Sequence, residues 1–191
     1  MSANSYAQKS TQITNLDASP TVRPTAGEDG AAAQTVIAQP IPFTTGDTTV
    51  TTTIYNVLRV PTTAVLKTLH LIADAPIDVA TTPTLTWAVG LAYSDNTNYD
   101  GTKVANQGTY VNSGTEFASA DTAGTQASGG VVHDISPTLG NQVLPLWKGP
   151  AGLTSDPGGF FDITMQVSAI SATETSTVPV NIGLRASFVS P

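Results

Sequence analysis

A regular alternation of side-chain character near the C-terminus constrains the fold of this chain more than any other feature. Between residues 178 and 188 every second residue is apolar, and the series is Val178, Val180, Ile182, Leu184, Ala186 and Phe188. Successive side chains of a β-strand point to opposite faces, so this pattern predicts a strand with one buried face. Residues 161–167 alternate in the same way, and the polar residues 171–177 between the two segments predict a C-terminal β-hairpin.

Other parts of the chain also predict strands. These segments cover residues 34–43, 50–60, 65–72 and 85–93. The second and third are joined at Pro61-Thr62-Thr63, and Pro40 and Pro42 confine the first to a sheet edge because proline has no N–H to donate. No segment predicts a helix of ordinary length. The expected fold is all-β: an antiparallel β-sandwich, jelly-roll-like, with an extended N-terminal arm.

The balance of polar residues agrees with this fold class. Charged residues make up 11% of the chain, against about 25% in an average domain. Neutral residues must therefore form most of the polar surface, and threonine recurs in runs such as Thr51-Thr52-Thr53. A β-branched residue is accommodated better in a strand than in a helix, so the composition favours β-structure.

The first 34 residues differ from the rest, because they have no sustained apolar period and contain Pro20 and Pro24. Such a segment cannot bury enough apolar surface to order by itself. We expect an extended N-terminal arm over residues 1–34 and a β-sandwich domain over residues 35–191. Three isolated apolar residues, Ile13, Leu16 and Val22, are candidate anchors with which the arm docks on a neighbouring subunit. A disordered tail is the alternative.

A long loop excursion is expected between about residues 94 and 140. Turn-forming residues recur in it, as in Asp95-Asn96-Thr97-Asn98 and Ser128-Gly129-Gly130. The residues predict a weak hairpin inside it, between residues 104–111 and 115–118. A stretch of this length without regular structure is typical of an exposed, functional segment.

The residues do not form a pattern typical of catalysis. Nucleophilic catalysis by serine needs a base, and the candidates are His70 and His133. His70 falls in a predicted strand, as a surface or satisfied core histidine. His133 and Asp134 are neighbours in the sequence, so they would point to opposite faces of a strand rather than act together. The chain has no Gly-x-Ser-x-Gly elbow, and we expect no enzyme and no catalytic residue.

Metal and cofactor sites are not expected either. The chain has no cysteine, and it has no glycine loop of the phosphate-binding kind. Oxygen-bearing residues gather between Asp95 and Asp100, where calcium is the most plausible ion, but turn formation explains that cluster better. The same turn explanation applies to Asp74 and Asp78.

The two tryptophans lie in different contexts. Trp87 belongs to an alternating strand and is predicted to lie in the core. Trp147 belongs to the proline-bounded segment 144–150. Tryptophan is favoured in buried interface pockets, so Trp147 is a possible interface anchor; a core plug under a loop is the alternative.

The charge distribution limits the kinds of partner. The net charge is −7, and the basic residues are scattered singly from Lys9 to Arg185. Nucleic acids and anionic membranes are bound by clustered Lys and Arg, so we expect neither partner. The N-terminal residues do not form a secretory signal, and no segment reaches the length of a membrane helix; we expect synthesis in a cytoplasm.

The opening residues 3–17, the Pro- and Gly-containing arm and the Thr-rich β domain together resemble small virion proteins of tailed bacteriophages. The closing segments, 161–167 and 178–189, are similar to the C-terminal hairpin of that group. The resemblance implies a capsid decoration or cement protein on the outside of the virion. Its partners would be the major capsid protein and further copies of itself, with a homotrimer favoured. It implies no site residues, because the group has no site motif to match.

Two functions follow as expectations. The first is a non-enzymatic protein that decorates and stabilises a capsid by binding coat-protein surfaces, with the arm docking on neighbouring subunits. A segment that orders on docking can cover much surface per residue, which suits this role. The alternative is a head-fibre or adhesin-type module that binds a host-surface glycan or receptor through the 94–140 excursion.

Overall fold

The computed structural model describes residues 8–9, 33–38, 41–43, 51–80, 83–94, 109–122, 132–169 and 180–189. These residues form β-strands and one short 3-10 helix. The elements are β1 (Gln8–Lys9), β2 (Ala33–Ile37), β3 (Ile41–Phe43), β4 (Ile54–Pro61), β5 (Val65–Ala73), β6 (Thr86–Tyr93), β7 (Ala118–Asp121), β8 (Val132–Asp134), η2 (Asn141–Val143), β9 (Phe160–Ala169) and β10 (Val180–Val189).

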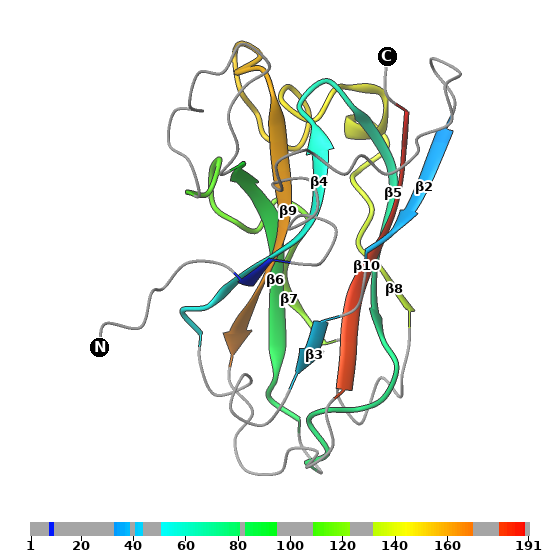
Figure 1. Cartoon of the computed structure of the whole chain (residues 1–191), viewed down its shortest axis with the longest axis vertical. Helices are drawn as coiled ribbons and strands as arrows, with labels where there is room; N and C mark the ends of the chain where they lie inside the picture. Colours follow the sequence, from blue (N-terminus) through cyan, green and yellow to red (C-terminus); the bar gives the residue numbers. More distant parts are fainter. Residues whose placement is uncertain are drawn as a thin grey trace, which may run out of the picture.

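The strands form two sheets that face each other (Figure 1). Sheet A has the order β1-β4-β9-β6-β7. Sheet B has the order β2-β10-β5-β8, and β3 also pairs with β10. The strands pair antiparallel except β1, which runs parallel to β4. The prediction of an all-β antiparallel sandwich is confirmed.

The pairing pattern is that of a jelly roll. Without β1, and with β2 and β3 taken as one interrupted first strand, the described strands of the domain number eight. The first then pairs with the last (β2 and β3 with β10), the second with the seventh (β4 with β9), the third with the sixth (β5 with β8) and the fourth with the fifth (β6 with β7). The chain is thus one long hairpin wound around itself into two sheets, as in double-sheet jelly rolls.

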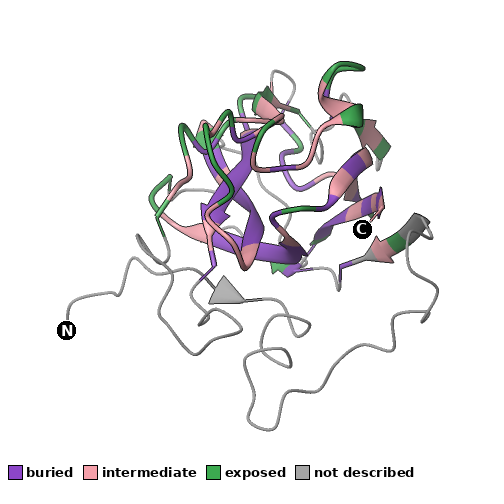
Figure 2. Ribbon diagram, turned by 90° about the horizontal axis from the view of Figure 1, so that it is seen from above, coloured by how far each residue is buried: buried purple, intermediate pink, exposed green. Residues whose placement is uncertain are grey.

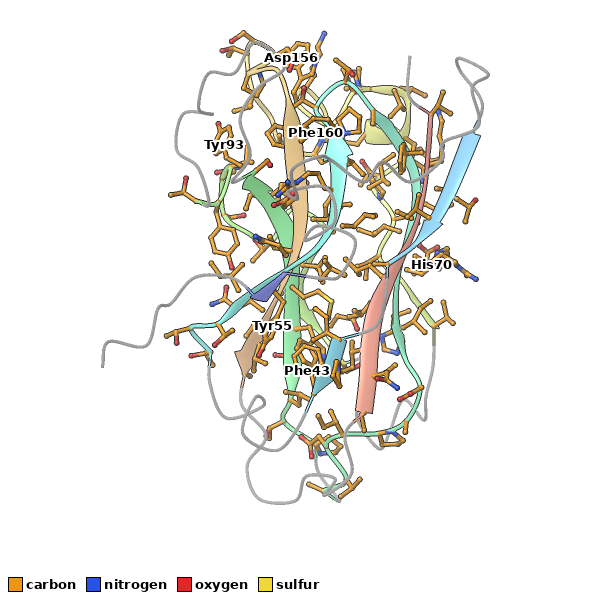
Figure 3. All side chains as sticks on the ribbon, viewed as in Figure 1. Phe43, Tyr55, His70, Tyr93, Asp156 and Phe160 are labelled. Carbon is orange, nitrogen blue, oxygen red and sulfur yellow. The ribbon has the colours of Figure 1, made fainter. Side chains whose placement is uncertain are left out.

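The core lies between the sheets, where the apolar residues of the alternating strands meet (Figure 2). Three buried aromatic rings pack together in it through Phe43. Phe43 packs edge-on against Tyr55, with ring centroids 4.7 Å apart, and against Trp87, at 4.9 Å (Figure 3). Trp87 is fully buried, which confirms its predicted place in the core. Such edge-to-face pairs add to the stabilisation that burial gives.

The predicted C-terminal hairpin is wrong. β9 lies in sheet A between β4 and β6, whereas β10 lies in sheet B between β2 and β5. The alternation correctly marked both strands, because it reflects which face of each strand is buried. It carries no information on the neighbouring strand, which is chosen by the winding of the whole chain.

Strand structure also occurs inside the segment expected to be a loop, residues 94–140. β7 and β8 lie there, and Tyr110 forms an isolated bridge with Ala92 of β6. β7 is four residues long and its sequence, Ala-Ser-Ala-Asp, has no large apolar residue, so no alternation could reveal it. The suggested hairpin between residues 104–111 and 115–118 is not formed by the described part: Val111 and Phe117 both donate to carbonyls of β6.

The first predicted strand, residues 34–43, is represented by β2 and β3. Among the described strands both pair only with β10, at the edge of sheet B. Pro42 lies opposite Asn181 in that pairing. The edge position agrees with the prediction from Pro40 and Pro42, because an edge strand needs only one side for hydrogen bonds.

Candidate interface surfaces

An irregular loop between β8 and β9, residues 135–159, closes one end of the sandwich; we call it the end loop (Figure 1). Backbone hydrogen bonds fix it to the turn between β4 and β5. The N–H of Leu146 donates to the carbonyl of Ala64 at 2.8 Å, and the N–H of Trp147 donates to the carbonyl of Thr62 at 3.1 Å. The N–H of Thr62 in turn donates to Gly159 at 3.1 Å. The end loop is therefore a fixed surface of the domain.

Two apolar side chains of the end loop project into solvent. Leu139 is 83% exposed and Val143 is 71% exposed, more than any other large apolar residue in the described ranges. The Thr138 carbonyl accepts from the N–H groups of both Asn141 and Gln142, so Leu139 and Val143 belong to one hydrogen-bonded turn that leads into η2. We call these two residues the apolar patch. Exposed large apolar side chains within a few residues of each other are candidates for a surface that another molecule covers.

Trp147 belongs to the end loop. It is partly buried and packs against the core. Its backbone is held at both groups, because its N–H donates to Thr62 and its carbonyl accepts from Leu153 at 2.8 Å. Part of the side chain remains accessible, and its role as an interface anchor stays a prediction.

Asp156 holds the last part of the end loop in place (Figure 3). Its Oδ1 accepts hydrogen bonds from the Thr62 hydroxyl at 2.7 Å and from the Gly158 N–H at 2.9 Å. Gly158 and Gly159 follow with φ angles of 73° and 75°, in the left-handed region that favours glycine. The loop thus enters β9 in a defined conformation, and little ordering is needed when a partner binds.

A buried ion pair lies on the face of sheet A that points away from the core. Arg59 of β4 and Asp162 of β9 are directly opposite each other. The Arg59 guanidinium donates two hydrogen bonds to the Asp162 carboxylate, from Nε to Oδ1 at 2.7 Å and from Nη2 to Oδ2 at 2.9 Å. The exposed fractions of the two side chains are 1% and 0%. The pair is therefore a structural element rather than an accessible binding site.

Residues 110–117, which we call the cover loop, lie over part of the same face. The Glu116 carboxylate takes the place that a carbonyl of a neighbouring strand would have. Its Oε2 accepts from the Leu91 N–H at 2.8 Å, and its Oε1 accepts from the N–H groups of Ser113 and Gly114. Gly90 leaves room for this approach, since a Cβ there would lie 2.2 Å from the Gly114 carbonyl carbon. Burial, and then the charge of Glu116, raise the pKa of Tyr110 to about 12.

The two histidines have separate surroundings. His133 Nδ1 lies 2.8 Å from Asp121 Oδ1, so this pair joins β8 of sheet B to β7 of sheet A. Asp134 instead accepts from Ser136, and those hydrogen bonds, followed by the nearby His70, lower the pKa of its carboxyl. His133 and Asp134 thus have different side-chain partners.

His70, which is labelled in Figure 3, lies on the outer face of sheet B. It is paired with Arg185 of β10 on one side and with Asp134 of β8 on the other. It is partly exposed, and its Nδ1 is buried with no hydrogen-bond partner among the described residues. Among the described residues, no three His, Cys, Asp or Glu side chains gather in a way that could hold a metal ion. The Asp95–Asp100 cluster lies outside the described residues. Within the same part of the chain, no helix is long and apolar enough to cross a membrane.

The N-terminal segment contacts the domain at one described point. Gln8 and Lys9 of β1 pair with Tyr55 and Asn56 at the edge of β4. The three candidate anchors of the arm, Ile13, Leu16 and Val22, lie outside the described residues. β2, which belongs to the jelly roll, begins at Ala33.

No protein-family model and no curated protein sequence matches this chain. Two solved structures are similar in fold. One is "Capsid of Ralstonia phage GP4", with a TM-score of 0.54 and 17% identity over 96% of this chain and 97% of the other. The second is "Cyanophage Pam1 capsid asymmetric unit", with a TM-score of 0.50 and 17% identity over 89% of this chain and 92% of the other. At this identity the likeness shows that the chain shares its fold with a chain in each of these two capsid structures.

Proposed function

We propose that this chain is a non-enzymatic structural component of a bacteriophage capsid, and more specifically a decoration protein on the outside of the shell. The observation that carries the proposal is the fold likeness to a chain of the Ralstonia phage GP4 capsid, which extends over nearly the full length of both chains. A decoration protein needs surfaces that bind the coat protein and neighbouring copies, without any chemistry. The end loop and the N-terminal arm are the candidates for these surfaces.

The apolar patch is suited to contact with the coat protein. Complete burial of one Leu or Val side chain stabilises a complex by roughly 1.5–3 kcal/mol, so the two residues together contribute at most about 3–6 kcal/mol. The end loop is already fixed by hydrogen bonds, which lowers the entropy cost of binding. Trp147, beside the patch in sequence and partly accessible, would extend it. The low charge of the chain would make such a contact insensitive to salt.

Shell binding tests the role of the patch. The double variant Leu139→Asp, Val143→Asp is compared with Val132→Asp, which places the same change on another exposed valine, 45% exposed on β8. Capsids of the phage that encodes the chain, purified without it, are incubated with each protein and sedimented. We expect at least a 100-fold weaker binding for the double variant, from about 3 kcal/mol of lost burial, and no change for Val132→Asp. Equal binding of all three proteins would exclude the patch as the contact.

The arm is tested separately. Deletion of residues 1–32 leaves β2 and hence the complete jelly roll. We expect an unchanged melting temperature and loss of shell binding, because Ile13, Leu16 and Val22 are proposed to dock on neighbouring subunits. Binding at full affinity would show that the arm has no role in docking.

The copy number on virions separates the proposed function from the alternative of a head-fibre or adhesin module. Decoration of the whole shell, in a homotrimer as we expect, requires hundreds of copies per particle, whereas a fibre at a vertex requires about a dozen. An adhesin would also give a saturable signal on a glycan array, and that signal would disappear with the 94–140 segment. A low copy number with such a signal would favour the alternative.

A further inference from the structure

The contact between β1 and β4 differs from the other strand pairings of the domain. It is parallel, it involves only Gln8 and Lys9, and these lie opposite Tyr55 and Asn56. The jelly roll of eight strands is complete without it, since β4 already pairs with β9 on its other side. β1 is therefore a strand added to a finished domain, by the mechanism through which peptides bind to sheet edges.

The edge of β4 is an acceptor of limited length. Among the described strands, β1 alone pairs with the side of β4 that faces away from β9. Unpaired N–H and C=O groups on such an edge readily accept another strand. The pairing of β4 with β9 is irregular between Asn56 and Leu58, directly after the two residues that contact β1. A bulge at Val57 bends the strand and locally disrupts pairing, so the acceptor is confined to the first part of β4.

The chain between β1 and β2 is long enough to reach more than one acceptor. Residues 10–32 separate them, and an extended chain of that length spans up to roughly 80 Å. That distance exceeds the diameter of a domain of this size, about 40 Å. A pairing of two residues is held by only a few hydrogen bonds and can exchange. The same contacts form whether the acceptor belongs to the same copy or to another one, which makes exchange of a segment inexpensive.

We propose that copies of this chain exchange their N-terminal segments, so that Gln8 and Lys9 of one copy pair with Tyr55 and Asn56 of a second copy. The inference rests on the proposed function, because copies that decorate one shell stand close to each other. Their effective concentration is then in the millimolar range, comparable to that of a tethered segment. The arm would thereby link neighbouring copies through sheet A, independently of the apolar patch on the end loop.

Disulfide trapping tests the exchange, and the absence of cysteine makes single-cysteine variants unambiguous. Lys9→Cys and Asn56→Cys place thiols on residues that are paired across neighbouring strands, within the Cα separation that disulfides require. The two variants are mixed and oxidised, both in solution and on capsids. The control mixture combines Lys9→Cys with Thr138→Cys, an exposed position on the end loop. We expect at least tenfold more disulfide-linked dimer, as seen on a non-reducing gel, from the first mixture.

Two results would overturn the exchange. One is no excess of dimer over the control mixture while the double variant Lys9→Cys, Asn56→Cys forms only an intrachain disulfide. The other is no disulfide in either form, which would show that β4 is not the acceptor. Asn56 is buried, so each variant is first checked by thermal unfolding.

Deletion of residues 1–9 gives a second measurement that needs no substitution in β4. At a protein concentration in the millimolar range, which matches the concentration on a shell, the deletion should lower the mean oligomer mass in sedimentation, and an unchanged mass would also overturn the exchange. The copy number on virions tests the proposed function separately. A chain that is abundant on virions but never cross-links between copies retains the proposed function and loses only this inference.

Discussion

The ion pair between Arg59 and Asp162 gives the sharpest test of how the sandwich is stabilised. The two residues form two hydrogen bonds of 2.7 and 2.9 Å, and almost no part of either side chain is exposed. Asp162→Asn keeps the shape of the side chain but removes its charge. Arg59→Met removes the guanidinium and keeps an apolar chain of similar length. Each variant leaves one buried charge without its main counter-charge.

The expected cost follows from the burial. Loss of one partner of a buried ion pair typically destabilises a protein by about 3–5 kcal/mol, since the remaining charge is desolvated without compensation. For a domain of this size, 1 kcal/mol corresponds to roughly 2–4 °C, so the melting temperature should fall by about 6–20 °C. Replacement of both residues by apolar ones, Arg59→Met with Asp162→Leu, is often close to neutral. The double variant should therefore be more stable than either single variant.

Urea unfolding of the wild type, the two single variants and the double variant measures these free energies. Lys148→Met is the control, because it removes one exposed positive charge and should change the free energy of unfolding by less than about 0.5 kcal/mol. Single variants that lose less than about 1 kcal/mol would refute the reasoning, because that is the range of a solvent-exposed pair. A double variant as unstable as the sum of the single variants would also refute it.

Three further predictions concern the cover loop and the contact between the sheets. Gly90→Ala should lower the free energy of unfolding in urea by about 1–3 kcal/mol, because its Cβ would collide with Gly114. The control Gly140→Ala, whose Cβ would have nothing within 4 Å, should change that free energy by less than about 0.5 kcal/mol. Equal effects of the two variants would exclude the close approach at Gly90. The wild type should lose stability as the pH rises from 10 to about 12, because the unfolded chain releases the Tyr110 phenol proton first, and Tyr110→Phe should reduce that loss; an unchanged pH profile would contradict it. His133→Gln should cost less than about 1 kcal/mol but speed amide exchange in β8, and unchanged exchange would show that the pair does not hold the strand.

The parts of the fold that the sequence predicts are those that depend on one strand at a time. Residues 161–167 and 178–188 alternate because one face of each is buried, and both are strands with those faces in the core. The partners of the strands depend on the winding of the whole chain. Strands that follow each other in the sequence of a jelly roll lie in different sheets wherever the chain crosses over. The residues of these two segments therefore could not show whether the segments pair with each other.

The contacts that organise the candidate surfaces leave almost no local signal. Glu116 replaces a strand backbone beside Leu91, and nothing in its neighbours indicates this role. Asp121 and His133 lie far enough apart in sequence that their pairing follows only from the meeting of β7 and β8. The apolar patch was missed for a different reason: Leu139 and Val143 are four residues apart, a spacing that a buried turn would share. Their exposure distinguishes the two cases.

The winding of the jelly roll also bears on the synthesis of the chain. β9 and β10 are made after the other described strands, yet each is an interior strand, between β4 and β6 in sheet A and between β2 and β5 in sheet B. Sheet A cannot close before residues 160–169 are made, nor sheet B before residues 180–189, and synthesis of about 190 residues takes roughly 10–40 s at common rates. A prematurely terminated chain would lack the central strand of at least one sheet. Folding itself would then keep incomplete copies from competing with complete ones for positions in an assembly.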